Sequence, residues 1–195
     1  MIITSSKILS IFSDFIKNPK GDRMSDDEVQ RLVYLIVKAN KILWDLEDSA
    51  RLSELGDKHI AEAKRNIDIH NQQRNELIRE IDTALARLLD VSRGTESSFY
   101  SESPGMIIDR LSIIFIKLSV VQKITSFIKE GSLKLEYIDK EKILEGQIES
   151  IGNFLDLYME RLLKKEVFFE IQQPVKIYND IRVKEYIKLV NNQGK

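Results

Sequence analysis

One long amphipathic repeat, over residues 57–90, limits what this chain can fold into. Its apolar residues recur at alternating intervals of three and four, the spacing that places side chains on one face of an α-helix. The whole chain of 195 residues has only three prolines and eight glycines. Long helices with short connections are therefore predicted, and the expected fold class is all-α.

Helix start and stop signals predict a bundle of four long antiparallel helices with short helices at both ends. Ser25 and Glu28 form a capping pattern for a helix that runs to about Leu55, and Gly56 ends it. The tight connection at Gly56 predicts an antiparallel hairpin with the next helix. The expected helices cover residues 6–17, 25–55, 57–90, 103–129, 139–165 and 181–190, within a single domain over residues 1–195.

Three segments between these helices are expected to be irregular. The stretch "SRGTESSFYSE" (92–102) reads as a polar loop, and "EGSLKLEY" (130–137) as a second loop. The segment "VFFEIQQPVKIYND" (167–180) is expected to be irregular or extended and held in place by Phe168, Phe169 and Tyr178.

Composition excludes several classes of function. The chain has no cysteine, so it has no disulfide and no thiolate metal site, as is typical of the cytoplasm. Its formal net charge is −1, which gives no overall attraction to nucleic acid. The most hydrophobic stretch, residues 106–121, is too short and too charged to span a membrane, and the N-terminus does not resemble a signal peptide. We expect a cytoplasmic protein with no membrane insertion.

The amphipathic repeats contain polar residues where an inner face should be apolar. On residues 57–90 the repeat is Ile60, Ala63, Ile67, Asn71, Arg74, Ile78, Ile81, Leu85 and Leu88. On residues 25–55 it is Val29, Val33, Ile36, Asn40, Leu43, Glu47 and Ala50. In an antiparallel hairpin the two polar interruptions can meet. The helix over 103–129 adds Asp109, Arg110 and Lys117 to an apolar surface.

Such a polar layer has two interpretations. A buried unpaired amide costs on the order of 1–3 kcal/mol, so these groups must satisfy one another or meet water or a ligand. A closed network would fix the register of the helices, as one asparagine does in a coiled coil. The other interpretation is the wall of a ligand pocket. The candidate ligand-binding residues are Asn40, Trp44, Glu47, Asp48, Arg51, Asp68, Asn71, Arg74, Asn75, Asp109 and Arg110.

Metal and nucleophile motifs are missing from the sequence. The two histidines, His59 and His70, follow no Glu-x-x-His pattern, and no Gly-rich phosphate loop or nucleophile elbow is present. No cofactor is predicted, but Mg²⁺ remains possible because Glu47, Asp48, Asp68 and Asp109 could supply carboxylates. Trp44 can be a core residue or a stacking wall for a ring.

Four blocks of this sequence carry a resemblance to a known family. They are "NKILWDLEDSAR", "KRNIDIHNQQRNELIREID", "ESPGMIIDRLSI" and "KIYND". In this order they resemble the bacterial domain-of-unknown-function family 4254 (DUF4254), over residues 29 to 180. The resemblance adds Asp82, Glu102 and Asn179–Asp180 to the polar positions. Members often accompany genes for surface-glycan glycosyltransferases, so the resemblance implies a link to glycan biosynthesis.

Three hypotheses for function remain open at this point. The first is an accessory protein that binds a small anionic, hydroxylated molecule, such as a nucleotide-sugar or glycan precursor, through Arg51, Arg74 and Arg110. The second is an enzyme that uses Glu47 or Asp109 as general acid or base. It could be a Mg²⁺-dependent nucleotide hydrolase, or a chorismate-mutase-like isomerase to which "NELIREIDTALARLL" is similar. The third is a structural or partner-binding bundle, including a possible homo-oligomer.

Overall fold

The structure, a computed structural model, describes residues 3–19, 21, 25–173, 181–183, 185–186 and 188–189. The helices of this part of the chain are α1 (Ser5–Lys17), α2 (Glu28–Ala50), α3 (Gly56–Leu89), α4 (Pro104–Phe127) and α5 (Ser132–Leu163), with the short 3₁₀ turns η1 (Ser53–Leu55) and η2 (Ile181–Val183). Two short strands, β1 (Ser98–Phe99) and β2 (Val167–Phe168), complete the described elements. The predicted all-α class is confirmed.

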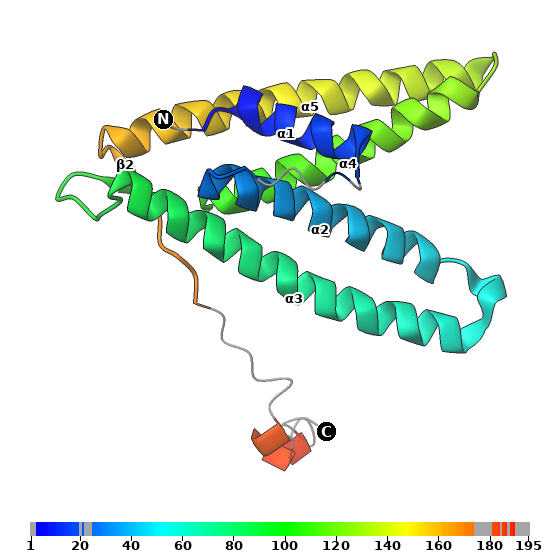
Figure 1. The fold of residues 1–195 in the computed structure, drawn as a ribbon, viewed down its shortest axis with the longest axis horizontal. Helices are drawn as coiled ribbons and strands as arrows, with labels where there is room; N and C mark the ends of the chain where they lie inside the picture. The colour runs from blue at the N-terminus through cyan, green and yellow to red at the C-terminus, as the bar shows by residue number, and fades with distance from the viewer. Residues whose placement is uncertain are drawn as a thin grey trace.

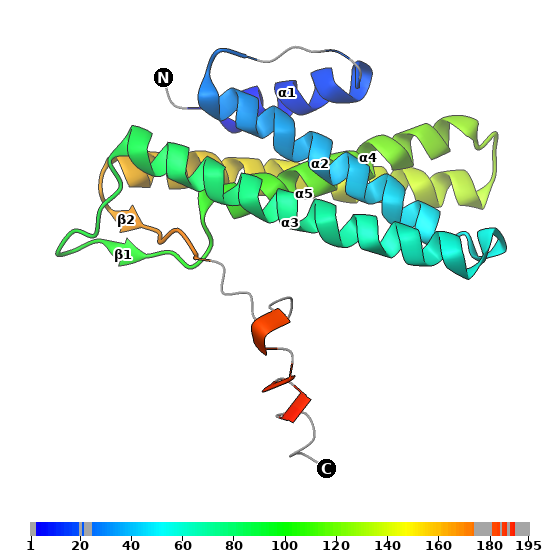
Figure 2. The ribbon, with the colours of Figure 1, turned by 60° about the horizontal axis from the view of Figure 1, so that its bottom comes forward.

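The long helices form two consecutive hairpins (Figure 1). Helices α2 and α3 pack along each other as predicted, and α4 packs along α5. The hairpins meet where α4 contacts both α2 and α3. Helix α1 lies against α2, α4 and α5, so it links the two hairpins (Figures 1 and 2).

A single cluster of buried apolar side chains draws on all the helices from α1 to α5. Helix α1 contributes Ile8, Phe12 and Phe15. Helix α4 is apolar around much of its circumference and is contacted by α1, α2, α3 and α5. Within the described residues, no helix has the length and hydropathy that crossing a membrane requires.

The hairpin between α2 and α3 begins and ends close to the predicted positions. The N-cap of α2 is Asp27, whose side chain accepts a hydrogen bond from the Gln30 backbone N–H at 2.9 Å, whereas Ser25 was the expected cap. Helix α2 ends at Ala50, five residues before the predicted Leu55, and η1 covers the last three of these five residues. Gly56 has a φ of 81°, a conformation that side-chain-bearing residues rarely adopt, so it makes the break there.

The prediction for the start of α5 was wrong. The segment 130–137 was expected to be a loop, but α5 begins at Ser132 and includes Asp139 as an interior residue. The connection from α4 consists of residues 128–131, and Gly131 at its end has a φ of 100°. The residues after it, including Leu133, Lys134 and Glu136, favour helices although they are largely polar, and this polarity resembled a loop.

A two-residue parallel strand pair joins the segment before α4 to the segment after α5. Ser98 N donates to Glu166 O at 3.0 Å, and Tyr100 N donates to Phe168 O at 2.9 Å. The extended conformation predicted after α5 is therefore present, and Phe168 and Phe169 are buried as expected. Tyr178 lies outside the described residues, and of the predicted last helix over 181–190 the structure describes η2 (Ile181–Val183) and helical residues at 185–186 and 188–189. The strand pair leads the chain to Gln172 and Gln173, beside α3.

Candidate functional site

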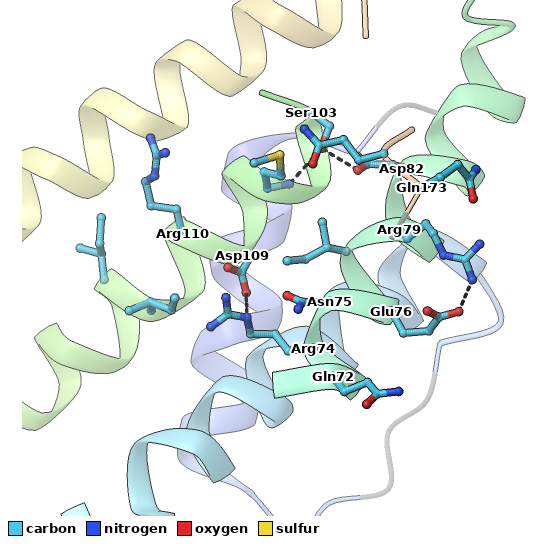
Figure 3. A pocket seen from close by; sticks show the side chains of 15 residues that line it. Gln72, Arg74, Asn75, Glu76, Arg79, Asp82, Ser103, Asp109, Arg110 and Gln173 are labelled. Carbon is cyan, nitrogen blue, oxygen red and sulfur yellow. Dashed lines mark hydrogen bonds and ion pairs between the residues drawn. The ribbon is translucent and has the colours of Figure 1, made fainter. Parts of the chain in front are cut away.

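A cavity of about 550 Å³ lies between α3 and α4; we call it the larger cavity (Figure 3). Its volume falls within the range of about 300–1,000 Å³ that is usual for small-molecule sites. The wall on α3 includes Gln72, Arg74, Asn75, Glu76, Ile78, Arg79 and Asp82, the wall on α4 includes Met106, Asp109, Arg110, Ile113 and Ile114, and Ser103, Gln172 and Gln173 complete it. Several of these side chains are exposed, so the cavity opens to the surface.

At one end of this cavity Asp82 holds the start of α4 against α3. Its buried carboxylate accepts hydrogen bonds from Ser103 Oγ at 2.6 Å and from the Gly105 backbone N–H at 2.7 Å. Ser103 is also the N-cap of α4. Burial raises the pKa of Asp82 to about 6, although both hydrogen bonds act to lower it.

The close approach of α3 and α4 at this end requires a glycine. A Cβ atom at Gly105 would lie 2.6 Å from Ile78 O and 2.7 Å from Asp82 Oδ1, and both distances are too short for non-bonded atoms. Gly105 therefore sets how near the two walls of the larger cavity can come.

The floor between α2, α3 and α4 is a polar network around Asp109. Asn40 Nδ2 lies 2.7 Å from Asp109 Oδ1 and 2.7 Å from Ser112 Oγ, so it donates to both. Ser112 Oγ donates in turn to the Asp109 backbone carbonyl at 2.8 Å. All three residues are buried. Burial raises the pKa of Asp109, while the Asn40 amide, Arg74 and Arg110 act in the opposite direction.

Arg74 is the loosely held member of this network. Its Nε lies 3.6 Å from Asp109 Oδ1, close enough for an ion pair but too far for a hydrogen bond. This Nε is buried and finds no hydrogen-bond partner among the described residues. Figure 3 shows Arg74 directly beside Asp109 at the wall of the larger cavity, while Arg110 is directed away from Arg74. Arg110 pairs with Glu102.

A second cavity, of about 230 Å³, lies between α2, α3 and α4; we call it the smaller cavity. It is lined by Asn40, Leu43, Trp44, Glu47, Asp48, Arg51, Asn71, Arg74, Ile113 and Ile116. Arg74 and Ile113 line both cavities. The polar interruptions of α2 and α3 therefore do come together, as the antiparallel hairpin predicts.

Ten of the eleven predicted residues line these two cavities. The smaller cavity takes Asn40, Trp44, Glu47, Asp48, Arg51, Asn71 and Arg74, and the larger cavity takes Arg74, Asn75, Asp109 and Arg110. Asp68 is exposed on α3 and belongs to neither of the two as the described residues form them. Glu47 and Asp48 are exposed at the rim of the smaller cavity rather than on the buried face, because α2 ends soon after them.

The carboxylates considered for Mg²⁺ are not gathered at one point. In the described part of the chain, no three His, Asp or Glu side chains converge in a way that could hold a metal ion. Asp109 is buried beneath Asn40, Asp48 pairs with Arg51 at 2.7 Å on the surface, and Asp68 lies apart from both cavities.

Several residues of the cavities and of the polar network beneath them were not among the candidate ligand-binding residues, although the family resemblance marks Asp82 as a polar position. Asp82 interrupts the apolar run of Ile81, Ala84 and Leu85, and this interruption is the signal that could have placed it in the site. Ser112 follows Asp109 by three residues, one helical turn, and so shares its face. Gln172 and Gln173 arrive through the strand pair, and no local pattern in the sequence indicates this.

Comparison with known proteins supports the resemblance found in the sequence. No curated protein and no solved structure matches this chain. One family, described as a protein of unknown function (DUF4254), matches residues 30–154. The match includes three of the four sequence blocks and both walls of the larger cavity on α3 and α4, whereas "KIYND" lies beyond it and outside the described residues. Since the match covers well over half of the chain, the protein belongs to the DUF4254 family.

Proposed function

We propose that the protein binds a small molecule with an anionic group and several hydroxyls, held between α3 and α4. The observation that carries this proposal is the Nε of Arg74. It is a buried donor on the wall of an open cavity, and no described residue accepts its hydrogen bond. Leaving such a donor unpaired costs on the order of 1–3 kcal/mol, and a ligand oxygen can remove that cost.

The charge of Arg74 is only partly compensated, which favours an anion as its partner. Asp109 lies 3.6 Å from Arg74, and burial raises the pKa of its carboxyl. This carboxyl therefore takes up a proton more readily than an ordinary aspartate and compensates the charge of Arg74 less well. Arg79 and Arg110 are paired with Glu76 and Glu102, and both pairs are substantially exposed. The Nε of Arg79 is also buried without an acceptor among the described residues, but Glu76 pairs with the Arg79 guanidinium. Arg74 is thus the cation of the larger cavity with the weakest carboxylate partner, and it gains most from a phosphate or carboxylate.

The remaining walls suit a molecule with hydroxyl groups and an apolar face. Gln72, Asn75 and Gln173 offer amides, each of which both donates and accepts hydrogen bonds. Ile78, Met106 and Ile113 supply an apolar surface beside them. Sugar rings combine hydroxyl edges with C–H faces, so a sugar phosphate or a nucleotide-sugar fits this lining.

The cellular part of the proposal rests on the family resemblance. We propose a cytoplasmic bacterial protein that is accessory to the synthesis of surface glycans. The absence of cysteine in a chain of 195 residues agrees with a reducing compartment.

Thermal unfolding with a panel of nucleotides, nucleotide-sugars and sugar phosphates tests this proposal. A ligand at a hundred times its Kd adds about 2.7 kcal/mol of stability. In a protein of this size each kcal/mol raises Tm by about 2–4 °C. The shift should be lost in Arg74→Met and kept in Arg65→Met, because Arg65 is an exposed arginine of the same helix outside both cavities. A panel that leaves Tm unchanged, or a shift that survives Arg74→Met, would contradict the proposal.

One observation favours an enzyme as the second candidate function. Asp82 and Asp109 are buried carboxyls on facing helices, both with raised pKa, and both line the larger cavity. Carboxyls of this kind can act as general acid or base near neutral pH. A time course of each stabilising ligand by NMR separates the two candidates, because binding alone leaves its spectrum unchanged. Turnover that is lost in Asp109→Asn would establish the enzyme.

A further inference from the structure

The two cavities share a wall, and that wall is polar. Arg74 and Ile113 line both of them. Asn40 lines the smaller cavity, Asp109 lines the larger one, and the 2.7 Å hydrogen bond between them crosses the boundary. An anionic group placed against the Arg74 guanidinium is therefore accessible from either side.

The two cavities differ in size and in chemistry. At about 230 Å³ the smaller cavity lies below the usual range for a complete small-molecule site, so it can take one ring rather than a whole ligand. Trp44 forms part of its wall, partly buried against the core and partly facing the cavity. The larger cavity is lined by amides, three arginines, three carboxylates, a serine and apolar side chains, but by no aromatic ring of the described residues.

We infer that the two cavities are compartments of one site for a nucleoside diphosphate sugar: the base stacks on Trp44, the phosphates lie against Arg74, and the sugar occupies the larger cavity. This inference rests on the proposed function and makes it specific. Stacking on an indole favours a flat ring without selecting one base by hydrogen bonds. The amides of Asn75 and Gln72 then read the sugar hydroxyls.

Trp44 also makes the inference directly measurable, because it is the only tryptophan of the chain. Its fluorescence reports occupation of the smaller cavity, when excitation is at the red edge of the indole band where the base does not absorb. UDP-glucose and UDP should both change the emission in a saturable way. Glucose 1-phosphate should raise Tm and leave the emission unchanged, since it has no aromatic base to stack on Trp44 in the smaller cavity.

Variants of the two compartments should separate the parts of the ligand. Trp44→Leu should weaken UDP-glucose binding about fivefold to a hundredfold, the range expected for loss of a stacked base, and leave glucose 1-phosphate binding unchanged. Trp44→Phe, which keeps a ring, should restore most of the affinity. Asn75→Ala should weaken glucose 1-phosphate and UDP-glucose severalfold and leave UDP unchanged.

Each outcome decides between the inference and the function on which it rests. UDP-glucose can raise Tm without changing the Trp44 emission of the wild type, and can bind Trp44→Leu as tightly as the wild type. If both results are found, the inference is wrong and the proposed function stands. If glucose 1-phosphate changes the emission as UDP does, the two compartments are not distinct and the inference is again wrong. If none of the three probes binds, both the inference and the proposed function are overturned.

Discussion

Arg74 lies against Asp109 without hydrogen-bonding to it: the Arg74 Nε and the Asp109 Oδ1 are 3.6 Å apart, across the boundary between α3 and α4. The same Asp109 oxygen receives a 2.7 Å hydrogen bond from Asn40. One carboxylate thus has a tight partner on α2 and a loose partner on α3. We infer that the tight contact maintains the fold, and that the loose one is available to a ligand.

This division predicts that two substitutions lower the stability of the protein by different amounts. Asn40→Ala should lower the free energy of unfolding by about 1–3 kcal/mol, because Asp109 and Ser112 lose a buried donor. Arg74→Met should cost less than about 1 kcal/mol, because the side chain is 28% exposed and Asp109 can take up a proton. Urea unfolding measures both values. A larger loss in Arg74→Met than in Asn40→Ala would favour a purely structural network.

Gly105 provides a test of how closely α3 and α4 must pack. Gly105→Ala places a Cβ against Ile78 O and Asp82 Oδ1, so we expect a loss of about 1–3 kcal/mol from overpacking. Gly146→Ala in α5 is the matched control, since its Cβ meets no described atom within 4 Å. That control should gain about 0.5–1 kcal/mol from helix propensity. Equal behaviour of the two variants in thermal unfolding would show that the approach at Gly105 is not tight.

Asp82 should make the stability of the protein depend on pH. Its pKa is about 6 in the folded protein against 3.8 for an ordinary aspartate, so the folded state binds more protons between these values. Stability therefore falls as pH rises through this window, by on the order of 2–3 kcal/mol from Asp82 alone. Asp82→Asn keeps an acceptor for Gly105 N and removes the titration. Subtracting its unfolding curve from that of the wild type isolates the effect, and a flat difference between pH 4 and pH 7 would disprove it.

Ligand binding should be linked to protonation of Asp109. An anion against Arg74 adds negative charge near this buried carboxyl, whose neighbours are Asn40 from α2, Arg74 from α3, and Ser112 and Arg110 from α4. The already raised pKa of Asp109 then rises further, so binding takes up a proton and affinity falls as pH increases. Calorimetry of UDP-glucose in buffers of different ionisation enthalpy measures this uptake. Asp109→Asn should abolish this proton uptake. Proton release when UDP-glucose binds the wild type would contradict the prediction.

Much of this architecture can be predicted from sequence because it depends on local patterns. The three-and-four repeat of Ile67, Asn71, Arg74 and Ile78 was enough to place Arg74 beside the core and to bring it near Asn40. The pattern gave Leu88 as an inner residue, but Leu88 is 52% exposed and Leu89 is buried. A strict repeat drifts around a long helix, and a shift of one residue moves a side chain to another face.

Other parts of the site depend on contacts between distant segments. The pairing of Ser98 with Val167 brings Gln172 and Gln173 to α3, and neither strand is long enough to show a pattern of its own. The division of the polar residues into two cavities also depends on the packing of α4 against the α2–α3 hairpin. Helix periodicity indicates on which face of its helix each residue lies. It does not indicate how much space remains between the facing helices.

The most direct test of the account is a calorimetric titration of UDP-glucose into the wild type, Arg74→Met and Arg65→Met. The account predicts saturable binding that is retained in Arg65→Met. In Arg74→Met the affinity should be at least about tenfold weaker, as expected for loss of a charge-assisted hydrogen bond. The same Kd in Arg74→Met and the wild type, or no binding heat in the wild type, would contradict it.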